Sequence, residues 1–301
     1  MAYRSRTEPW KLTILRLLKT RMTLSEKDSQ HYLSLKKGYE GEVMFDALIE
    51  NLQCDCYILN DLLFKINNSM FQIDTLIIAS EKVYFYEVKN YVGDYYCDSN
   101  QLYKVPRSEY NNPLHQLNRS ESLLRQLLQD IGVTLPIEAK VVFINPEFTL
   151  YQAPLDKPFI FPTQVKRYLK KLDATPSKLT EYHMKLADKL ISLHTEENPY
   201  TLLPPYNYEQ LRKGITCKAC SSFLISVQGH YCVCSDCGQE QLVTDAVLRS
   251  VKEYLLLFPR GKITTNIIYD WSGGVKDKRT IRRVLLKKFK KIGTHLGTYY
   301  E

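Results

Sequence analysis

Long hydrophobic runs are missing from this 301-residue sequence, which excludes a helical membrane protein. No stretch approaches the roughly 20 apolar residues that a membrane-spanning helix requires. The basic start of the chain lacks both the apolar run and the small-residue cleavage site of a secretory signal. We therefore expect a soluble protein that is not exported, is not bound to a membrane and resides in the cytoplasm.

Internal repeats and low-complexity tracts are also absent, so a solenoid or a biased linker protein is not indicated. A hydrophobic content of 44% with 12% aromatic residues is enough to form packed cores, and disorder is not the default interpretation. Because single domains cluster near ~100–200 residues, this length predicts two or three domains.

Net charge is lacking over most of the chain, and the excess of positive charge is concentrated at its end. Residues 241–301 contain thirteen Lys and Arg against five Asp and Glu, an excess equal to the net charge of +8 of the whole chain. A basic terminal module is typical of a protein that binds a phosphate backbone, although an anionic membrane surface is an alternative target.

The order of predicted elements between residues 35 and 146 indicates an α/β domain built round a mixed sheet. Apolar spacing predicts helices over residues 35–52 and 113–128, with Gly38 and Gly41 allowing the start of the first to approach another backbone. Runs rich in Ile, Leu, Phe and Tyr predict strands over residues 57–64, 71–79, 83–89 and 138–144. Two further helices are predicted over residues 163–172 and 177–193.

Charged residues on two of these strands suggest a catalytic site. Glu87 and Lys89 lie two apart on one strand, so their side chains share a face. A two-residue connection near residues 80–82 would place Asp74 opposite Lys89, and a four-residue one would place it opposite Glu87. A three-residue connection would need a bulge. The other sheet face is expected to pack against helices through Ile73, Ile77, Tyr84, Tyr86 and Val88.

This set of residues has the chemistry of phosphodiester cleavage. Asp74 and Glu87 could hold Mg²⁺ or Mn²⁺, whose bound water attacks phosphorus. Lys89 would orient that water or stabilise charge on the phosphoryl oxygens. We expect Glu42 to complete the acidic cluster or assist a second ion, and Gln116 to position water or phosphate. His115, its neighbour, is expected to point elsewhere.

The alternative interpretation is structural. Glu-x-Lys occurs by chance in many strands as a solvated edge, and Asp74 could be an ordinary surface carboxylate. The order of Glu42, Asp74, Glu87 with Lys89, and Gln116 on helix, strand, strand and helix favours the catalytic interpretation.

Four segments of residues 36–146, about a third of the chain, resemble the nuclease-related domain of the PD-(D/E)XK superfamily. They are Gly38-Tyr39-Glu40-Gly41-Glu42, Gln72-Ile73-Asp74, Glu87-Val88-Lys89-Asn90-Tyr91 with Gly93, and Asn112-Pro113-Leu114-His115-Gln116. The resemblance implies a restriction-endonuclease-like fold, a mixed sheet flanked by helices, and a metal-dependent active site at Asp74, Glu87 and Lys89 that acts on DNA. Glu42 and Gln116 are the implied supporting residues. Thr75 departs from the pattern, because many relatives have His after the Asp.

Five of the eight cysteines lie within residues 217–237, in the spacing of a metal site. The pairs Cys217 with Cys220 and Cys234 with Cys237 are two C-x₂-C knuckles that can close a tetrahedral structural Zn²⁺ site. The segments between them predict a hairpin, and so a zinc ribbon. Cys232 is an alternative ligand to Cys234, and disulfides or redox chemistry are the alternative use. Cys54, Cys56 and Cys97 have no evident partners and are expected to be small buried residues.

The basic end of the chain predicts a helix over residues 263–271, a turn at Ser272-Gly273-Gly274 and a helix over residues 278–291 capped by Asp277, a spacing that resembles a helix-turn-helix. One face of the second helix is apolar, with Ile281, Val284, Leu285, Phe289 and Ile292, and is expected to dock on residues 255–258. The cations expected to contact DNA are Lys278, Arg279, Arg282, Arg283, Lys287 and Lys290.

Together these patterns predict five parts. They are an N-terminal helical extension (1–35), the nuclease-related domain (36–197), a Pro-containing linker (198–214), the zinc ribbon (215–240) and a basic helix-turn-helix-like DNA-binding module (241–301). The expected function is a Mg²⁺-dependent deoxyribonuclease. The alternatives are a DNA-binding or regulatory protein with a catalytically idle nuclease fold, and a membrane-surface protein. The sequence leaves open whether the protein is a homodimer.

Overall fold

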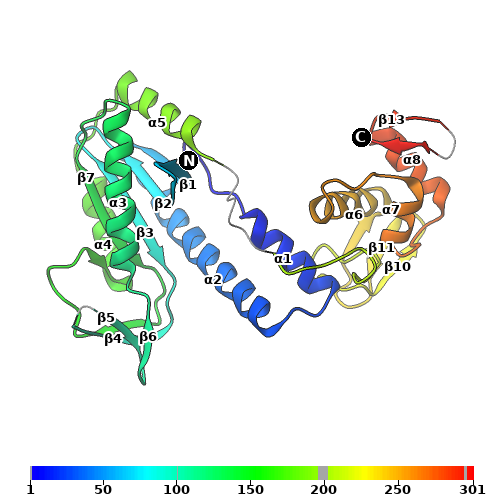
Figure 1. Ribbon diagram of the computed structural model, residues 1–301, viewed down its shortest axis with the longest axis horizontal. Coiled ribbons are helices and arrows are strands. Elements are labelled where there is room, and N and C mark those ends of the chain that lie inside the picture. The colour runs from blue at the N-terminus through cyan, green and yellow to red at the C-terminus, as the bar shows by residue number, and fades with distance from the viewer. Residues whose placement is uncertain (1, 100, 196–202, 295–296) are drawn as a thin grey trace. The chain divides into compact units, whose positions relative to one another are not determined.

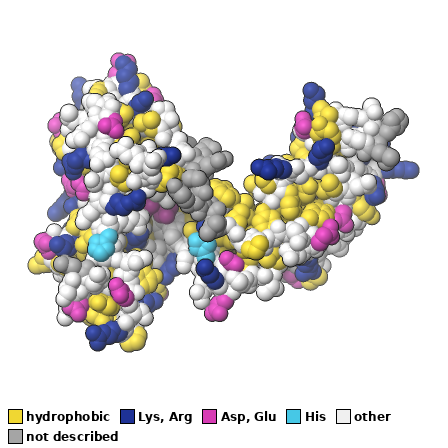
Figure 2. Space-filling model, in the orientation of Figure 1, with side chains coloured by type: hydrophobic (Ala, Val, Ile, Leu, Met, Phe, Trp, Pro, Cys, Tyr) yellow, Lys and Arg dark blue, Asp and Glu magenta, His cyan; other side chains and the backbone are white. Residues whose placement is uncertain are grey.

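A computed structural model describes residues 2–99, 101–195, 203–294 and 297–301 (Figure 1). The chain forms two compact units. Unit 1 comprises Met1–Pro9 and Leu33–Thr201, and unit 2 comprises Trp10–Tyr32 and Leu202–Glu301. Eight helices lie in the described residues, with mixed sheets between them, which confirms the α/β fold class. Lys and Arg are intermixed with Asp and Glu on the face of unit 1 seen in Figure 2.

Unit 1 is built on a five-stranded mixed sheet with the order β1-β2-β3-β7-β9. Strands β1 to β3 are antiparallel neighbours, whereas β3, β7 and β9 run parallel. Their bounds are β1 Tyr57–Ile66, β2 Ser69–Ile78, β3 Val83–Lys89, β7 Ile137–Phe143 and β9 Phe159–Ile160. The four strands expected from composition are therefore present, and the structure adds β9.

Two helices cover each face of this sheet. Helices α3 (Pro113–Asp130) and α5 (Glu181–Leu193) pack on one face through residues such as Leu124 and Leu190. Helices α2 (Glu26–Ile49) and α4 (Pro162–Asp173) pack on the other, where Phe45 and Leu169 are buried. The sheet is therefore enclosed on both sides, and α2 and α3 bring polar side chains to the end of β3.

A second, smaller sheet was not predicted. It has the order β6-β5-β4-β8. Its bounds are β4 Gly93–Asp98, β5 Gln101–Lys104, β6 Ser108–Tyr110 and β8 Phe148–Tyr151. Its short strands are rich in tyrosine and polar residues, so hydrophobic alternation gives no strong strand signal there. The buried ring of Tyr95 joins this sheet to the core around Phe143.

Two predicted helix starts in unit 1 are wrong. Helix α2 begins at Glu26 and not near residue 35, because Ser25 Oγ accepts a hydrogen bond from the Asp28 amide (3.1 Å) and caps the helix nine residues earlier. Gly38 and Gly41 consequently lie inside the helix. Helix α5 begins at Glu181 because Ser177 is engaged elsewhere, donating its hydroxyl to Asp55 O at 2.6 Å.

Unit 2 has one core that joins α1, the cysteine-rich hairpin and the C-terminal helices. Helix α1 (Trp10–Arg21) contributes Leu18, the hairpin contributes Cys232, and the helices contribute Trp271 and Leu285. The bounds are β10 Ile225–Gln228, β11 Tyr231–Cys234, β12 Glu240–Leu242, α6 Val243–Leu257, α7 Thr265–Trp271, α8 Lys278–Lys288, β13 Lys291–Ile292 and β14 Tyr299–Tyr300. Arg21 is buried here, 2.6 Å from the Glu253 carboxylate and over the Trp271 ring.

The last predicted helix is shorter than expected. Asp277 caps α8 as predicted, accepting from the Thr280 amide at 2.9 Å, but the helix ends at Lys288. Lys291 and Ile292 form β13, which pairs with β14, so Ile292 is not part of the apolar helix face. Ile263 is likewise not helical. It forms a bridge to Tyr300 just before α7, whose cap is Thr264.

The structure does not test the predicted division into five domains, and some of the predicted parts can be assigned to the two compact units. Residues 1–35 are shared between the two units, and residues 203–214 belong to unit 2, where Leu211 is buried. Residues 198–202 of the expected linker lie outside the described residues. None of the described helices has both the length and the apolar character that crossing a membrane demands.

Candidate functional site

Strand β3 and helix α3 bring three predicted site residues together at the end of the large sheet. Lys89 Nζ lies 2.6 Å from Glu87 Oε1 and 3.0 Å from Gln116 Oε1. Glu87 and Lys89 share a face because they are two apart on a strand, and Gln116 is in the first turn of the helix that covers this face. The result is an ammonium held between a carboxylate and an amide oxygen.

Asp74 reaches the same point from β2. Four residues, 79–82, connect β2 to β3, and the register pairs Ile78 with Val83 and Thr75 with Tyr86. Asp74 and Glu87 are the next residues along each strand, which corresponds to the four-residue alternative. Asp74 Oδ2 accepts a hydrogen bond from the Val88 amide at 2.8 Å, which fixes the carboxylate against β3.

The alternation of β2 side chains between the two faces of the sheet is shifted at Asp74. The β1–β2 ladder pairs Asn60 with Thr75 and Leu62 with Ile73, whereas Asp61 and Asp74, between them, are not paired. Asp61 has a φ of 54°, the left-handed region. Ile73 and Leu76 consequently both pack in the core beneath α3 and α5, and the expectation that Ile73 faces the opposite helices is wrong. Ile77, Tyr84, Tyr86 and Val88 do pack on that opposite side.

Glu42 is held by a different partner. From α2 its Oε2 accepts from Arg6 Nη1 at 2.6 Å, and Arg6 Nη2 also donates to the Asp74 carbonyl at 2.7 Å. Among described residues, the cysteine set considered below is the only group of three or more His, Cys, Asp or Glu side chains whose ligand atoms all lie within 4.8 Å of one another. The carboxylates of Glu42, Asp74 and Glu87 therefore do not meet at a single point.

Burial raises the pKa of all three carboxyl groups, because it disfavours their charged form. Burial and then the Asp74 charge raise the pKa of Glu87 to about 8, and the same two causes raise the pKa of Glu42 to about 8. Burial also raises the pKa of Asp74, although Lys89 opposes this. Burial disfavours the ammonium of Lys89, but Glu87 and Asp74 outweigh it and raise the pKa of Lys89. Lys89 therefore stays protonated. The negative charges of the carboxyl groups around it are not fully compensated by nearby cations.

Such a site suits a divalent cation. Neither oxygen of the buried Glu87 carboxylate has a hydrogen-bond donor of good geometry in the described part of the chain, although Oε1 contacts the Lys89 ammonium. Buried carboxylate oxygens without donors are costly unless a cation neutralises them. Hard oxygen ligands from Asp74 and Glu87 are those that Mg²⁺ and Mn²⁺ prefer.

A cavity of about 310 Å³ opens beside Lys89. It is lined by Lys89, Tyr91, Asn111, Asn112, Pro113, His115 and Gln116. Asn112 Oδ1 caps α3 by accepting from the Leu114 amide at 3.0 Å, which sets the position of the first helical turn. His115 lines this cavity together with Gln116, so the expectation that it points elsewhere is wrong. Both residues are exposed in the first turn of α3, and consecutive residues at a helix N-terminus can line the same cavity.

One of the comparisons with known proteins gave a match. Residues 37–144 match the family model described as a nuclease-related domain (NERD). This segment, about a third of the chain, is similar to nuclease-related domains. Searches of curated proteins and of solved structures gave no match. The matched segment contains Glu42, Asp74, Glu87, Lys89 and Gln116, whose individual roles the match does not assign.

Arg6 is the site residue that the sequence analysis missed. It lies 31 positions before the first matched residue of the nuclease-related domain, and its contacts reach residues 36 to 69 positions away. Its side chain is only 3% exposed. A basic N-terminal segment alone gives no signal for such a contact, since Arg4, Lys11 and Arg16 share it.

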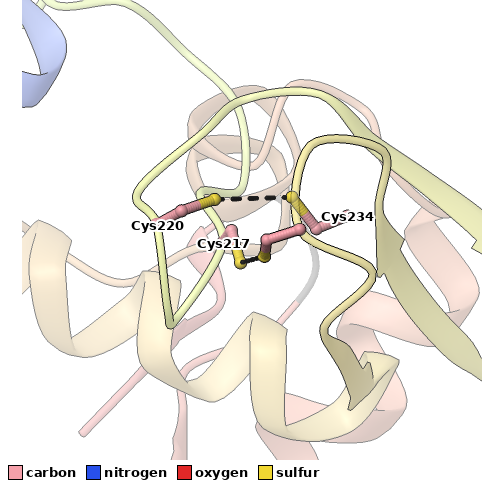
Figure 3. Close-up of side chains that lie close together, drawn as sticks. Cys217, Cys220 and Cys234 are labelled. Atoms are coloured by element: carbon pink, nitrogen blue, oxygen red, sulfur yellow. Dashed lines mark hydrogen bonds between the residues drawn. The ribbon is translucent and has the colours of Figure 1, made fainter.

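The second candidate site is the cysteine cluster of unit 2 (Figure 3). Cys217 Sγ lies 3.6 Å from Cys237 Sγ, and Cys220 Sγ lies 3.6 Å from Cys234 Sγ, with all four sulfurs within 4.8 Å of one another. A disulfide would bring sulfurs to ~2 Å, whereas Zn–S bonds of ~2.3 Å in a tetrahedron separate them by about 3.8 Å. The donor set and spacing fit Zn²⁺ in a zinc ribbon.

The surroundings of Cys217 favour thiolate. Burial raises its pKa, but backbone amides of Cys220 and Ala219 donate to the sulfur and lower the pKa of Cys217 to about 7. The Ala219 amide lies 3.4 Å from Sγ. Cys232 points into the unit 2 core and is not in the cluster, so the alternative ligand set is excluded. Cys54, Cys56 and Cys97 are half-buried free thiols, not fully buried as expected.

Helix α8 separates apolar and basic residues as predicted over its shortened length. Ile281, Val284 and Leu285 are buried in the unit 2 core, which also contains Leu257 of α6. The six predicted DNA-contacting cations, Lys278, Arg279, Arg282, Arg283, Lys287 and Lys290, are all exposed. In the part of the chain that the structure describes, none of the six forms an ion pair with a carboxylate.

Proposed function

We propose that the protein is a metal-dependent nuclease that hydrolyses phosphodiester bonds in DNA. One observation carries this proposal. The Lys89 ammonium contacts Glu87 at 2.6 Å and Gln116 at 3.0 Å, at the place where the Asp74 carboxylate is fixed by the Val88 amide. The nuclease-related domain supports the reaction class.

Each residue has a role that follows from its contacts. Asp74 and Glu87 would hold Mg²⁺ or Mn²⁺, because their oxygens are buried, close and short of positive charge. Lys89 would donate hydrogen bonds to the scissile phosphate, and it is oriented for this by Glu87 and Gln116. Gln116, exposed at the cavity, can accept a hydrogen bond from a water and donate one to a phosphate oxygen.

When bound, the divalent ion would supply an activated water and neutralise developing charge on the phosphate. The protein residues supply position and exclusion of bulk water. Asp74 and Glu87 are 6% and 1% exposed, so their charges act in a poorly screened environment. Lys89 keeps its proton there, because two carboxylates raise its pKa, and it can thus serve as a permanent cation beside the phosphate.

The direct test is cleavage of supercoiled plasmid, single-stranded DNA and RNA with Mg²⁺ or Mn²⁺. Asp74→Asn, Glu87→Gln and Lys89→Met should each lower cleavage by at least 100-fold, in line with loss of a metal ligand or an electrostatic stabiliser. Lys178→Ala, an exposed cation of unit 1, is the matched control and should cleave normally. Equal activity in all five proteins would remove the residue basis of the proposal.

The alternative is a DNA-binding or regulatory protein with an idle nuclease fold. It predicts tight DNA binding without cleavage under every metal condition. The same substrates decide between the two, provided that binding is measured alongside cleavage.

A second function, nucleic-acid binding by unit 2, is favoured by the exposed cations of α8. The order α6, a bridge at Ile263, α7, α8 and the β13–β14 pair resembles a helix-turn-helix followed by a small hairpin, which supports this proposal. We propose that the six cations contact DNA phosphates. The zinc ribbon would then brace this module, since its Cys232 shares the same core.

Salt dependence tests this binding in the uncleaving Asp74→Asn protein. Adding Arg282→Ala and Arg283→Ala should reduce the slope of log Kd against log salt by about 1 to 2, because each lost phosphate contact removes about 0.9 from the slope for duplex DNA. Lys166→Ala with Arg167→Ala removes two exposed cations from α4 and should leave the slope unchanged. An α8 variant with an unaltered slope would exclude α8 from the interface. Anionic vesicles that compete with DNA would instead support a membrane-surface role.

A further inference from the structure

The N-terminal segment is built into the proposed nuclease site. Arg4 pairs with the β1 edge: its amide donates to the Ile58 carbonyl at 3.1 Å, and its carbonyl accepts from the Asn60 amide at 3.0 Å. Arg4 Nη2 also donates to the Asp61 carbonyl at 3.2 Å. The segment is thereby fixed beside the point where the β1–β2 ladder is interrupted, and Arg6 follows two residues later.

The Arg6 guanidinium binds acidic groups of two elements. On α2 it donates to Glu42 Oε2 at 2.6 Å and to the two oxygens of Asp46 at 2.8 and 3.1 Å. On β2 it donates to the Asp74 carbonyl at 2.7 Å and lies 3.3 Å from Thr75 Oγ1. Glu42 and Asp46 are four apart on a helix and so lie one above the other, which allows one planar guanidinium to take both.

This arrangement divides the acidic groups into two sets. Glu42 and Asp46 both contact the Arg6 guanidinium, whose side chain is 3% exposed. Lys89 contacts Glu87 and opposes the rise in the pKa of Asp74 that burial causes, and the Glu87 oxygens have no hydrogen-bond donor of good geometry among the described residues. Arg6 thus supplies a positive charge on the α2 side of the site, whereas the Glu87 oxygens on the β3 side have no such donor among the described residues.

We propose that Arg6 takes the place of a second cation, so that the site binds a single divalent ion between Asp74 and Glu87. This inference rests on the proposed nuclease function. Arg6 is a positioning residue. It holds Glu42 away from the ion and fixes the Asp74 backbone, and it does not contact substrate.

Ion counting distinguishes this role from that of an ordinary structural arginine. The full-length, zinc-loaded protein is titrated with Mn²⁺, and free ion is followed by electron paramagnetic resonance. The wild-type protein should bind one Mn²⁺ besides its zinc. Arg6→Met should bind two, and the second should disappear in Arg6→Met with Glu42→Gln. Arg6→Lys, which keeps the charge, should bind one, as should the surface control Arg167→Ala.

Glu42→Gln alone provides a test that does not depend on removing Arg6. With Arg6 in place, this variant should still bind one Mn²⁺ with a Kd within threefold of the wild-type value. Loss of an ion, or a tenfold weaker Kd, would make Glu42 a ligand and overturn the inference, as would a wild-type count of two. Circular dichroism and zinc content verify that each variant is folded.

The nuclease proposal fails by a different result. Asp74→Asn should bind no Mn²⁺ at this site, and unchanged Mn²⁺ binding in that variant would contradict the assignment of Asp74 as a ligand. If Asp74→Asn loses the ion while Arg6→Met still binds one, the nuclease site stands and the role given to Arg6 does not.

Discussion

Gly41 is the residue through which α2 approaches the end of β3. A Cβ atom there would lie 2.4 Å from the Cβ of Asn90, and no real Cβ contact is that short. Asn90 donates to the Lys37 carbonyl of α2 at 2.7 Å and accepts from Asn145 at the same distance, so it links α2, β3 and the segment after β7. Its side chain cannot move away without breaking both bonds.

Gly41→Ala should therefore lower the free energy of unfolding by about 1–3 kcal/mol, the usual cost of overpacking. Gly38→Ala is the matched control, since it lies in the same helix with nothing within 4 Å of its Cβ position. That change should be neutral or stabilise by roughly 0.5–1 kcal/mol, because alanine favours helix. Urea unfolding of both variants measures the difference. Equal stability would mean that Asn90 gives way easily.

The buried carboxyl group of Glu87 predicts an unusual pH dependence. Its pKa is about 8 in the folded protein against an ordinary value near 4.5, so the folded state binds the proton more tightly. Its stabilising contribution is complete below pH ~4.5 and is lost as the pH rises through about 8. Asp74 and Lys89 face it from β2 and β3, Glu42 acts on it from α2, and Lys89 stays charged throughout this range.

In Mg²⁺-free buffer, the free energy of unfolding of the wild-type protein should fall between pH 5.5 and 8.5. In Glu87→Gln, which is neutral at every pH, the fall should be clearly smaller. Saturating Mg²⁺ should stabilise the wild-type protein more at pH 8.5 than at pH 5.5, because the ion competes with the proton. Urea titrations at four pH values measure this, and parallel curves for the two proteins would contradict the assigned pKa.

Sequence spacing predicted part of this site. The rest depends on a connection length, on contacts between distant residues and on local backbone conformation, which spacing does not reveal. The shared face of Glu87 and Lys89 follows from strand periodicity alone. The residue opposite Asp74 depended on the length of the connection between β2 and β3, which the sequence left open between two, three and four residues. Arg6 could not be found, because its contacts are made across 36 to 69 positions by a segment with no pattern of its own. The left-handed residue Asp61, which shifts the alternation of β2, gave no signal either.

At the scale of elements, long periodic segments were predicted and short ones were not. The expected bounds of β3 match those observed, and α3 and α4 differ from expectation by no more than two residues at either end. The strands β4 to β6 have only three to six residues and pack through tyrosine rings. The ring centroids of Tyr91 and Tyr95, for example, lie 5.4 Å apart. Such contacts follow from tertiary packing and not from local alternation.

The cysteine-rich hairpin is an element whose stability we expect to depend on bound Zn²⁺. A hairpin of four-residue strands is too small to fold unaided, and its Cys232 completes the unit 2 core. Cys217→Ser should therefore reduce the zinc content from one per chain to none and lower the unfolding temperature of unit 2. Cys54→Ser, outside the cluster, should retain zinc. Atomic absorption with thermal melting checks both, and zinc retained by Cys217→Ser would exclude this ligand set.

At the scale of the whole molecule, the chain has two sets of cores, each beside a different candidate ion site. The cores of unit 1 enclose the large sheet, and the core of unit 2 joins α1, the ribbon and the three C-terminal helices. Mg²⁺ is proposed to bind only unit 1, and Zn²⁺ only unit 2. A ligand stabilises the cooperative unit that binds it, so each ion reports on one unit.

Calorimetry should accordingly resolve two transitions. Mg²⁺ at 100 times its Kd adds about 2.7 kcal/mol to the unit that binds it, which should raise one transition by roughly 5–10 °C in a unit of this size. Asp74→Asn should abolish that shift and leave the other transition in place. Cys217→Ser should lower the second transition and leave the Mg²⁺-dependent one. A single transition that responds to both ions would mean that the two units unfold as one.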